Sequence, residues 1–191
     1  NTPNSAAFSF TGQFTAAAWI KPTIADYVGQ GNANNWGTII QQWTWVDPPA
    51  VINGYGINRF NNGTIMVFNG TATTYTTPTS IGTAPLNVWT HVAHVFDGAA
   101  DRIYINGLLD SAFPATAAPG LSSAPLHVGR DDYNRFFYGY IDEVRLFNAA
   151  LTAAQIAVLH GGMPAPGGLS ATTAPNLVTL TWNAVPGATG Y

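Results

Sequence analysis

Residues 137–153 read FYGYIDEVRLFNAALTA, and this stretch decides the fold. Apolar Val144 and Leu146 alternate with charged residues, which is the period of two expected of a strand with unlike faces. Ile141 is also apolar but has the opposite parity to Val144, so an extra residue must be accommodated near Asp142. The stretch therefore predicts a β-strand with a bulge.

A short helix is predicted directly after this strand. Thr152 and Gln155 stand three apart, as in a capping box, and Leu151 precedes them in the position of a hydrophobic staple. Gly161 and Gly162 follow the helical segment, where glycine commonly ends a helix. The strand and the helix together predict the closing elements of a domain.

Short strand patterns recur at regular spacing in the preceding sequence. Phe14–Ile20 ends at a Lys-Pro pair, and Tyr55–Arg59 faces Thr64–Phe68 across an Asn-Asn-Gly turn, a strong hairpin signal. Further strands are predicted at residues 38–46, within 71–83, at 89–96 and at 102–105. Many short strands and one terminal helix predict an all-β, two-sheet sandwich.

Four segments resemble, in the same order, the laminin-G-like, concanavalin A-like jelly-roll modules of secreted proteins. They are FTAAAWIKP (14–22), WTHVAHVFDGAADRIYING (89–107), PLHVG (125–129) and GYIDEVRLFNAALTAAQI (139–156). The resemblance implies an antiparallel jelly-roll domain over residues 1–162, with a lectin-like function.

The composition changes after this domain. Residues 163–168, MPAPGG, are typical of a linker. Residues 169–191 resemble the start of a bacterial fibronectin type III domain, with Val178, Leu180 and Trp182 at alternate apolar positions of a strand. At 23 residues this segment is far shorter than the ~100 residues of an immunoglobulin-like sandwich, so it is interpreted as truncated.

The composition excludes several classes of partner. Only 8% of the 191 residues are charged and the net charge is −3, so the chain cannot neutralise a row of phosphates and nucleic acid is not expected as a partner. No apolar run approaches the length of a membrane span. Cysteine is absent, which excludes disulfides and thiolate metal sites. We expect an extracellular bacterial protein, secreted or on the cell surface; no signal peptide is visible, and a mature protein or an excised fragment would have lost it.

The acidic residues do not predict catalysis. Glu143 is the only glutamate and it adjoins Asp142 on a strand, where neighbouring side chains face opposite ways. Asp131 and Asp132 are also adjacent, in a loop, so they too are not expected to face one bond together. Glycosidases need two carboxyl groups that flank one bond, so no enzyme is predicted.

Asp142 has two interpretations that stay open. In jelly-roll families that this chain resembles, the matching carboxylate binds a structural calcium together with backbone carbonyls, and calcium accepts six to eight oxygens. The alternative is a carboxylate that caps backbone amides at the bulge. We expect calcium as a structural cofactor under the first interpretation.

The four histidines are assigned structural roles. His91 and His94 stand three apart on a strand, so they point to opposite faces and cannot share one metal ion. His127 lies in a core-type strand, and His160 lies at the helix end, where it can bond terminal carbonyls.

Aromatic residues carry the main functional signal. The chain has six tryptophans and eight tyrosines, and flat rings stack on sugars while nearby polar groups orient hydroxyls. Trp36 and Tyr133 lie among polar neighbours in predicted loops. The predicted ligand-binding residues are Trp36, Gln41, Trp43, Trp45, Arg130, Asp132 and Tyr133.

Two alternatives accompany this glycan hypothesis. Trp43 and Trp45 could belong to the core between the sheets, and the module could be an adhesion or spacer domain that binds protein, since fold does not fix function. An exposed aromatic surface with a polar border would favour glycan, whereas six buried tryptophans would favour the spacer.

A last expectation concerns strand exchange. In the resembled family a further strand precedes the segment that corresponds to Asn1, and it pairs beside the closing strand. An unpaired sheet edge readily accepts another strand. We expect either the tail, residues 176–184, or a segment of another chain to pair beside residues 141–146.

Overall fold

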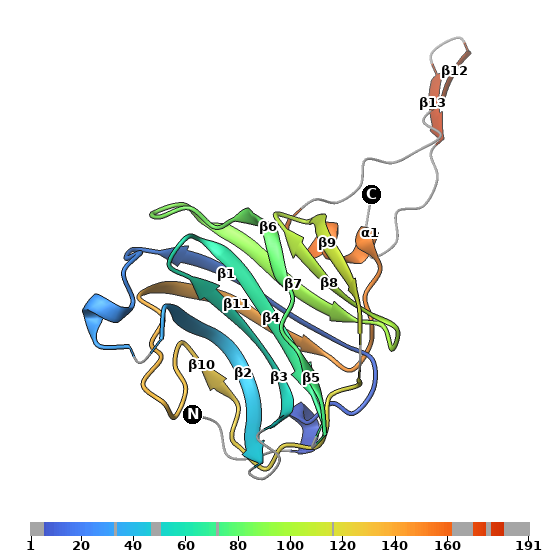
Figure 1. Cartoon of the computed structure of the whole chain (residues 1–191). Coiled ribbons are helices and arrows are strands. Elements are labelled where there is room, and N and C mark those ends of the chain that lie inside the picture. The colour runs from blue at the N-terminus through green and yellow to red at the C-terminus, as the bar shows by residue number, and fades with distance from the viewer. Residues whose placement is uncertain are drawn as a thin grey trace.

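The computed structural model of the protein describes residues 6–32, 34–46, 51–71, 73–115, 117–161, 170–174 and 177–181. Two antiparallel sheets pack face to face in this part of the chain (Figure 1). The predicted all-β jelly-roll sandwich is confirmed.

Sheet A holds five strands in the order β11-β1-β7-β8-β9. Turns of matching chemistry join the consecutive strands: Asn106 and Gly107 both have positive φ, as a tight hairpin turn requires. The strands are β1 (Phe14–Pro22), β7 (Thr90–Phe96), β8 (Ala100–Ile105), β9 (Leu108–Pro114) and β11 (Gly139–Phe147).

Sheet B has the order β10-β2-β3-β4-β5, and β6 also pairs with β4. The hairpin predicted around Asn61-Asn62-Gly63 joins β3 to β4. The strands are β2 (Trp36–Val46), β3 (Val51–Phe60), β4 (Thr64–Gly70), β5 (Tyr75–Thr76), β6 (Thr79–Thr83) and β10 (His127–Val128). Two short 3-10 turns, Ala6–Phe8 and Val28–Gln30, lie outside the sheets.

The core lies between the sheets and is built from alternate strand residues. Phe14 stacks on Phe10 at 5.5 Å between ring centroids and meets Tyr55 at 4.9 Å, and all three rings are buried. Each such side chain contributes about 2–3 kcal/mol of burial free energy. His94 also points into this core, where its Nε2 lies 2.7 Å from the buried carboxylate of Asp101.

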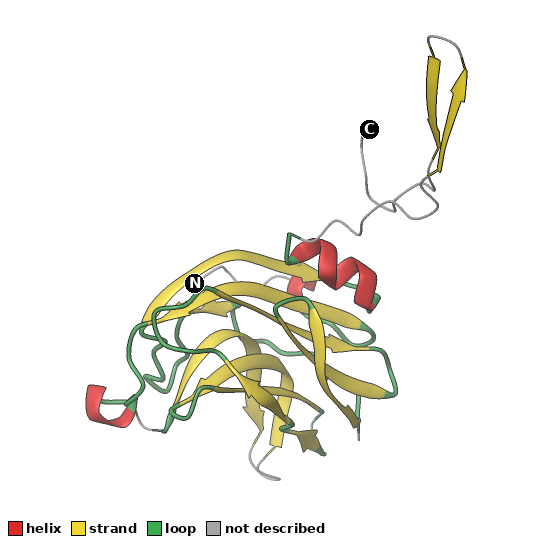
Figure 2. Ribbon diagram, turned by 90° about the horizontal axis from the view of Figure 1, so that it is seen from above, coloured by secondary structure: helices red, strands yellow, loops and turns green. Residues whose placement is uncertain are grey.

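The closing elements follow the sequence prediction. Pairing between β1 and β11 shifts register between Ala17 and Trp19, and Glu143 has a φ of 49°, so the bulge near Asp142 is confirmed. Helix α1 (Ala153–Leu159) begins with the predicted capping box. Its buried Ile156 packs against the outer face of sheet A, and Figure 2 shows α1 on the outside of the sandwich.

The tail forms a separate two-stranded sheet. Strand β12 (Ser170–Ala174) pairs with β13 (Leu177–Thr181), so the expectation that the tail pairs beside residues 141–146 is wrong for the described part of the tail. The physical reason is local: the two β-rich segments are close in sequence and close a hairpin at small entropic cost. Trp182 lies outside the described residues, and the fibronectin assignment stays a prediction.

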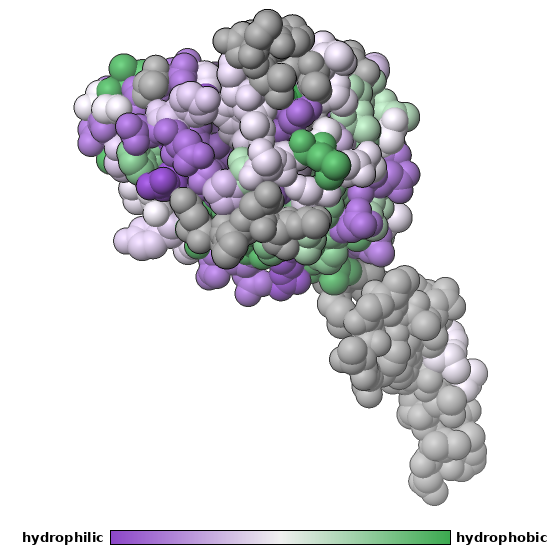
Figure 3. Space-filling view, turned by 90° about the horizontal axis from the view of Figure 1, so that it is seen from below, coloured by the Kyte–Doolittle hydropathy of each residue, from purple (hydrophilic) through white to green (hydrophobic). Residues whose placement is uncertain are grey.

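One face of the molecule shows how polar and apolar residues are distributed on the surface. Figure 3 shows one face on which hydrophilic and near-neutral residues prevail and apolar residues form separate patches. In the described residues, no helix has both the length and the hydropathy needed to cross a bilayer.

Candidate functional site

A bulge in β2 gathers the aromatic residues on the face of sheet B that points away from sheet A, here called the open face. The register of β2 against β3 shifts between Thr38 and Ile40, and Ile39 and Ile40 both enter the core. Trp36 therefore faces the same side as Trp43 instead of the opposite side. The prediction that Trp36 lies in a loop is wrong, because it is the first residue of β2.

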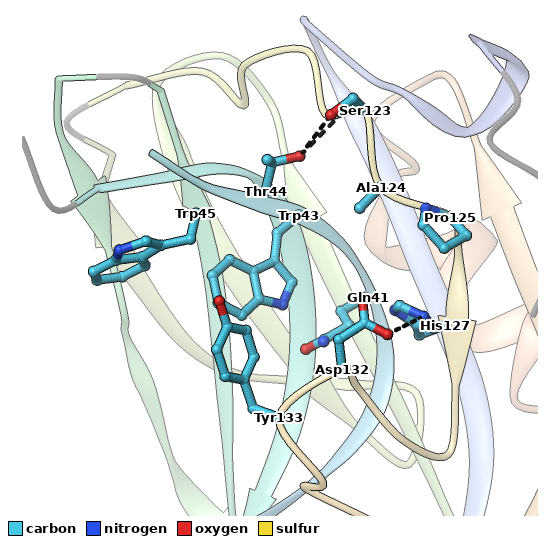
Figure 4. Close-up of a pocket in the computed structure, with 10 residues that line it drawn as sticks. All are labelled: Gln41, Trp43, Thr44, Trp45, Ser123, Ala124, Pro125, His127, Asp132 and Tyr133. Carbon is cyan, nitrogen blue, oxygen red and sulfur yellow. Dashed lines mark hydrogen bonds and ion pairs between the residues drawn. The ribbon is translucent and has the colours of Figure 1, made fainter. Parts of the chain in front are cut away.

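The first pocket on the open face has a volume of about 280 Å³ (Figure 4). It lies between β2 and the two segments that precede and follow β10, residues 123–125 and 132–133. Its polar lining includes Gln41 and Thr44 of β2, Ser123 of the segment before β10, His127 of β10 and Asp132 of the following loop. Trp43, Trp45 and Tyr133 supply its rings.

The second pocket adjoins the first and has a volume of about 320 Å³. Trp36, Trp43, Asn58, Met66, Phe68 and Arg135 are among its lining residues. Gly56 on β3 makes room for its floor, because a Cβ at that position would overlap the Phe68 ring. The absence of a side chain at Gly56 thus lets an aromatic ring lie across the strand.

A wall of stacked rings separates the two pockets. The Trp43 indole stacks on the Tyr133 ring with 5.5 Å between centroids and 20° between planes. The Arg135 guanidinium lies 5.4 Å from the Trp43 ring, 5.0 Å from that of Tyr133 and 5.3 Å from that of Trp36. These are cation–π distances, so one cation holds three rings in place.

Asp131 organises the loop that carries Asp132, Tyr133 and Arg135. Its buried carboxylate accepts hydrogen bonds from the backbone N–H of Tyr133 (2.9 Å) and of Arg135 (3.0 Å). It also forms an ion pair with the Arg135 guanidinium. Sequence reasoning missed Arg135, although an Asp and an Arg four residues apart in RDDYNR were a signal of this loop.

Two buried polar atoms at the pockets accept or donate no regular hydrogen bond among the described residues. They are Asn58 Oδ1 in the second pocket and His127 Nε2 in the first, and both residues are 2% exposed. His127 Nε2 nevertheless lies at ion-pair distance, 3.3 Å, from Asp132 Oδ1, so the Asp132 carboxylate is its partner. Buried polar atoms are nearly always hydrogen-bonded, so Asn58 Oδ1 is available to a ligand.

The structure brings six of the seven predicted ligand-binding residues to these two pockets: Trp36, Gln41, Trp43, Trp45, Asp132 and Tyr133. Arg130 lines neither pocket and lies 3.9 Å from Asp132, at the rim. The interpretation of Trp43 and Trp45 as core residues is wrong, since both lie on the open face and Trp45 is 43% exposed. None of the five tryptophans that the structure describes is buried.

Asp142 lies on the outer face of sheet A, away from the pockets. Its carboxylate accepts from the Glu143 N–H, and the side chains that share its cavity are the indoles of Trp19 and Trp89. Indoles offer no oxygen ligand, and no cluster of three metal-ligating side chains occurs in the described ranges. These side chains fit calcium poorly. Calcium at Asp142 stays a prediction.

His91 also lies on this outer face, so His91 and His94 point to opposite sides as predicted. Its ring meets Trp19 at 5.6 Å and His160 at 5.9 Å, and His160 stacks on Trp19 at 5.1 Å. Burial, with the His160 and Arg145 charges as smaller causes, lowers the pKa of His91 to about 4.

This lowered pKa predicts acid sensitivity. An unfolded histidine takes up its proton near pH 6.5, whereas folded His91 does so near pH 4. Between these values the unfolded state binds more protons, so the free energy of unfolding falls as the pH falls, by up to about 1.4 kcal/mol per pH unit. We expect His91→Gln to flatten this slope in urea unfolding at pH 7 and pH 5. Parallel slopes for His91→Gln and wild type would contradict the assignment.

The two-sheet sandwich and its aromatic, polar-lined open face define the class of lectin-like jelly-roll domains. Within that class, residues 1–157 match the family described as the concanavalin A-like lectin/glucanases superfamily, and the chain belongs to this family. No curated protein sequence matches the chain.

Several solved structures are similar to this chain. Domain 4 of AbnA, an extracellular arabinanase from Geobacillus stearothermophilus solved with arabinotriose, has a TM-score of 0.57 and 23% identity over 79% of this chain and 68% of that one. The CBM40 of Ruminococcus gnavus IT-sialidase, bound to α2,3-sialyllactose, has a TM-score of 0.63 and 14% identity, and the match covers 82% of this chain and 86% of that one. A heptameric SAP-like pentraxin from Limulus polyphemus has a TM-score of 0.55 and 18% identity, and the match covers 83% of this chain and 79% of that one. At these identities the likeness shows the fold alone.

Proposed function

We propose that this chain is a non-catalytic carbohydrate-binding module of an exported protein, and that an oligosaccharide binds across both pockets of the open face. One observation carries the proposal: the Trp43–Tyr133 wall stands between two pockets, one with the unpartnered buried oxygen of Asn58 and the other with the His127–Asp132 pair. Two similar structures support it, because they were solved with arabinotriose and with sialyllactose.

The chemistry of the open face suits a sugar chain. Carbohydrates present apolar C–H faces that stack on rings and hydroxyls that both donate and accept hydrogen bonds. The rings of Trp36, Trp43 and Tyr133 serve the first need. Asn58 Oδ1 accepts from hydroxyls, and so does the Asp132 carboxylate that pairs with His127.

The carboxylates of the site support binding without hydrolysis. Among the described lining residues of both pockets, Asp132 is the sole acid. Asp131 is adjacent, but its oxygens are engaged by two backbone N–H groups and Arg135. A glycosidase needs two carboxyl groups that flank one bond.

Alanine substitution of the exposed rings tests this proposal. We expect Tyr133→Ala and Trp36→Ala each to weaken glycan binding about fivefold, because one stacked ring contributes about 1 kcal/mol. A glycan array that includes arabinotriose and α2,3-sialyllactose identifies the ligand, and calorimetry then measures affinity.

Trp89→Ala is the matched control, since Trp89 is 42% exposed but lies on sheet A's outer face. It should retain wild-type affinity for glycan. If no glycan on the array binds, the proposal fails and an adhesion or spacer role replaces it. Pairing of a strand from another chain beside β11, which pairs only with β1 in the described residues, stays a prediction of that role.

A further inference from the structure

The outer face of sheet A carries a second aromatic groove, unrelated to the two pockets. Backbone pairing aligns Asp142 with Trp19 and Trp19 with His91, so these side chains form one row across three strands. Tyr140 pairs with Lys21 in the next row, and the Tyr140 ring lies 6.4 Å from that of Trp89. Trp19, Trp89 and Asp142 line a shallow, open pocket of about 330 Å³ on this face.

The groove combines rings with a carboxylate that lacks a cationic partner. Asp142 takes part in none of the ion pairs among the described residues, whereas adjacent Glu143 pairs with Arg145. Tyr140 is 60% exposed and Trp89 is 42% exposed. The groove therefore presents negative charge and the electron-rich faces of rings together.

One ammonium group of the chain itself, that of Lys21, already lies near this surface. Its Nζ lies 6.0 Å from the centre of the Tyr140 ring. Lys21 does not line the cavity, so the space between Trp19, Trp89 and Asp142 is open to a cation from outside. His160 stacks on Trp19 and fixes the indole beside this space.

We propose that the groove binds a quaternary ammonium group, the trimethylammonium end of a choline-type ligand. A trimethylammonium ion has an apolar surface and a positive charge, and aromatic rings with a nearby carboxylate satisfy both. A sugar has fewer hydrogen-bond partners here than on the open face, because the lining side chains offer one carboxylate and two indole N–H groups. The proposal is independent of glycan binding on the open face.

Choline chloride is the probe, and its neutral carbon analogue 3,3-dimethyl-1-butanol is the matched ligand. Titration calorimetry with the full chain should show choline binding and at least tenfold weaker binding of the analogue, which has the same shape without the charge. Equal binding of the two, or no binding of choline, overturns the proposal. Sedimentation with phosphatidylcholine vesicles then identifies the source: co-sedimentation assigns a lipid headgroup, and its absence assigns a soluble choline compound.

Two variants locate the site. Trp89→Ala should lower choline affinity about tenfold and Asp142→Asn about fivefold, with unchanged melting temperatures because both side chains are exposed. Trp45→Ala, with 43% exposure on the open face, should leave choline binding intact. Loss of choline binding in Trp45→Ala but not in Trp89→Ala would contradict the assignment. For glycan binding the expectation is the opposite: Trp89→Ala should leave it intact, whereas Trp45→Ala should weaken it. The failure of one proposal can therefore be told apart from the failure of the other.

Discussion

Replacing Asp131 by alanine is expected to lower the free energy of unfolding by about 3 kcal/mol and to remove most of the glycan affinity. The carboxylate is buried, and it accepts from two backbone N–H groups while it pairs with Arg135. Its removal leaves a largely buried guanidinium without a counter-charge, which typically costs about 3–5 kcal/mol. Arg135 then loses the position from which it holds Trp36, Trp43 and Tyr133.

Two variants control this experiment. Asp131→Asn keeps an oxygen that accepts from the backbone N–H groups but removes the charge, so its loss of stability should be intermediate. Asp132→Ala, one residue further on, removes a side chain that is 61% exposed and should change stability by less than about 0.5 kcal/mol. Urea unfolding measures all three. Wild-type stability in Asp131→Ala would mean that the loop does not depend on this carboxylate.

The fold could be predicted because its signals are local. The bulge near Asp142 followed from the parity of neighbouring apolar residues, and the capping box at Thr152 from a spacing of three. Strand β9, Leu108–Pro114, was not predicted, since its sequence LLDSAFP has no regular alternation. It is a strand because it completes the edge of sheet A, which is a tertiary effect.

The candidate site could be predicted only in part. Gln41, Trp43 and Trp45 are alternate residues of one strand and therefore share a face. Once residues 38–46 were assigned to a strand, all three were expected on the same side. Trp36 needed the bulge at Thr38, which no local pattern indicates. The role of Gly56 depends on a ring from the next strand. The residues that meet across neighbouring strands are determined by the pairing register, and no local sequence pattern specifies this register here.

The outer groove could not be predicted from the sequence either, because it also depends on contacts between strands. Trp19, Trp89 and Asp142 come from three distant segments, and they meet because β11 and β7 flank β1. The family resemblance suggested calcium at Asp142, with backbone capping as the alternative, and calcium there stays a prediction. The two indoles that line the pocket beside Asp142 could not be inferred from either interpretation, and they motivate the choline proposal.

Replacing Trp43 by alanine is expected to weaken glycan binding at least about thirtyfold, the largest effect of any single ring. Trp43 lines both pockets, stacks on Tyr133 and touches the Arg135 guanidinium, and Phe68 meets it at 6.2 Å. Its loss removes one stacking surface and releases the others, and such shared central residues typically contribute 2 kcal/mol or more. Thirtyfold corresponds to about 2 kcal/mol.

Calorimetry against the glycan identified on the array measures this loss. Trp43→Phe keeps a ring in the wall and should lose about fivefold, between wild type and alanine. Both variants should keep a cooperative thermal transition, since Trp43 lies on the open face and outside the main core. Choline binding at the outer groove should be unchanged in both, which shows that the protein is folded. Wild-type glycan affinity in Trp43→Ala would mean that the ligand does not use the ring wall, and the open face would lose its assignment.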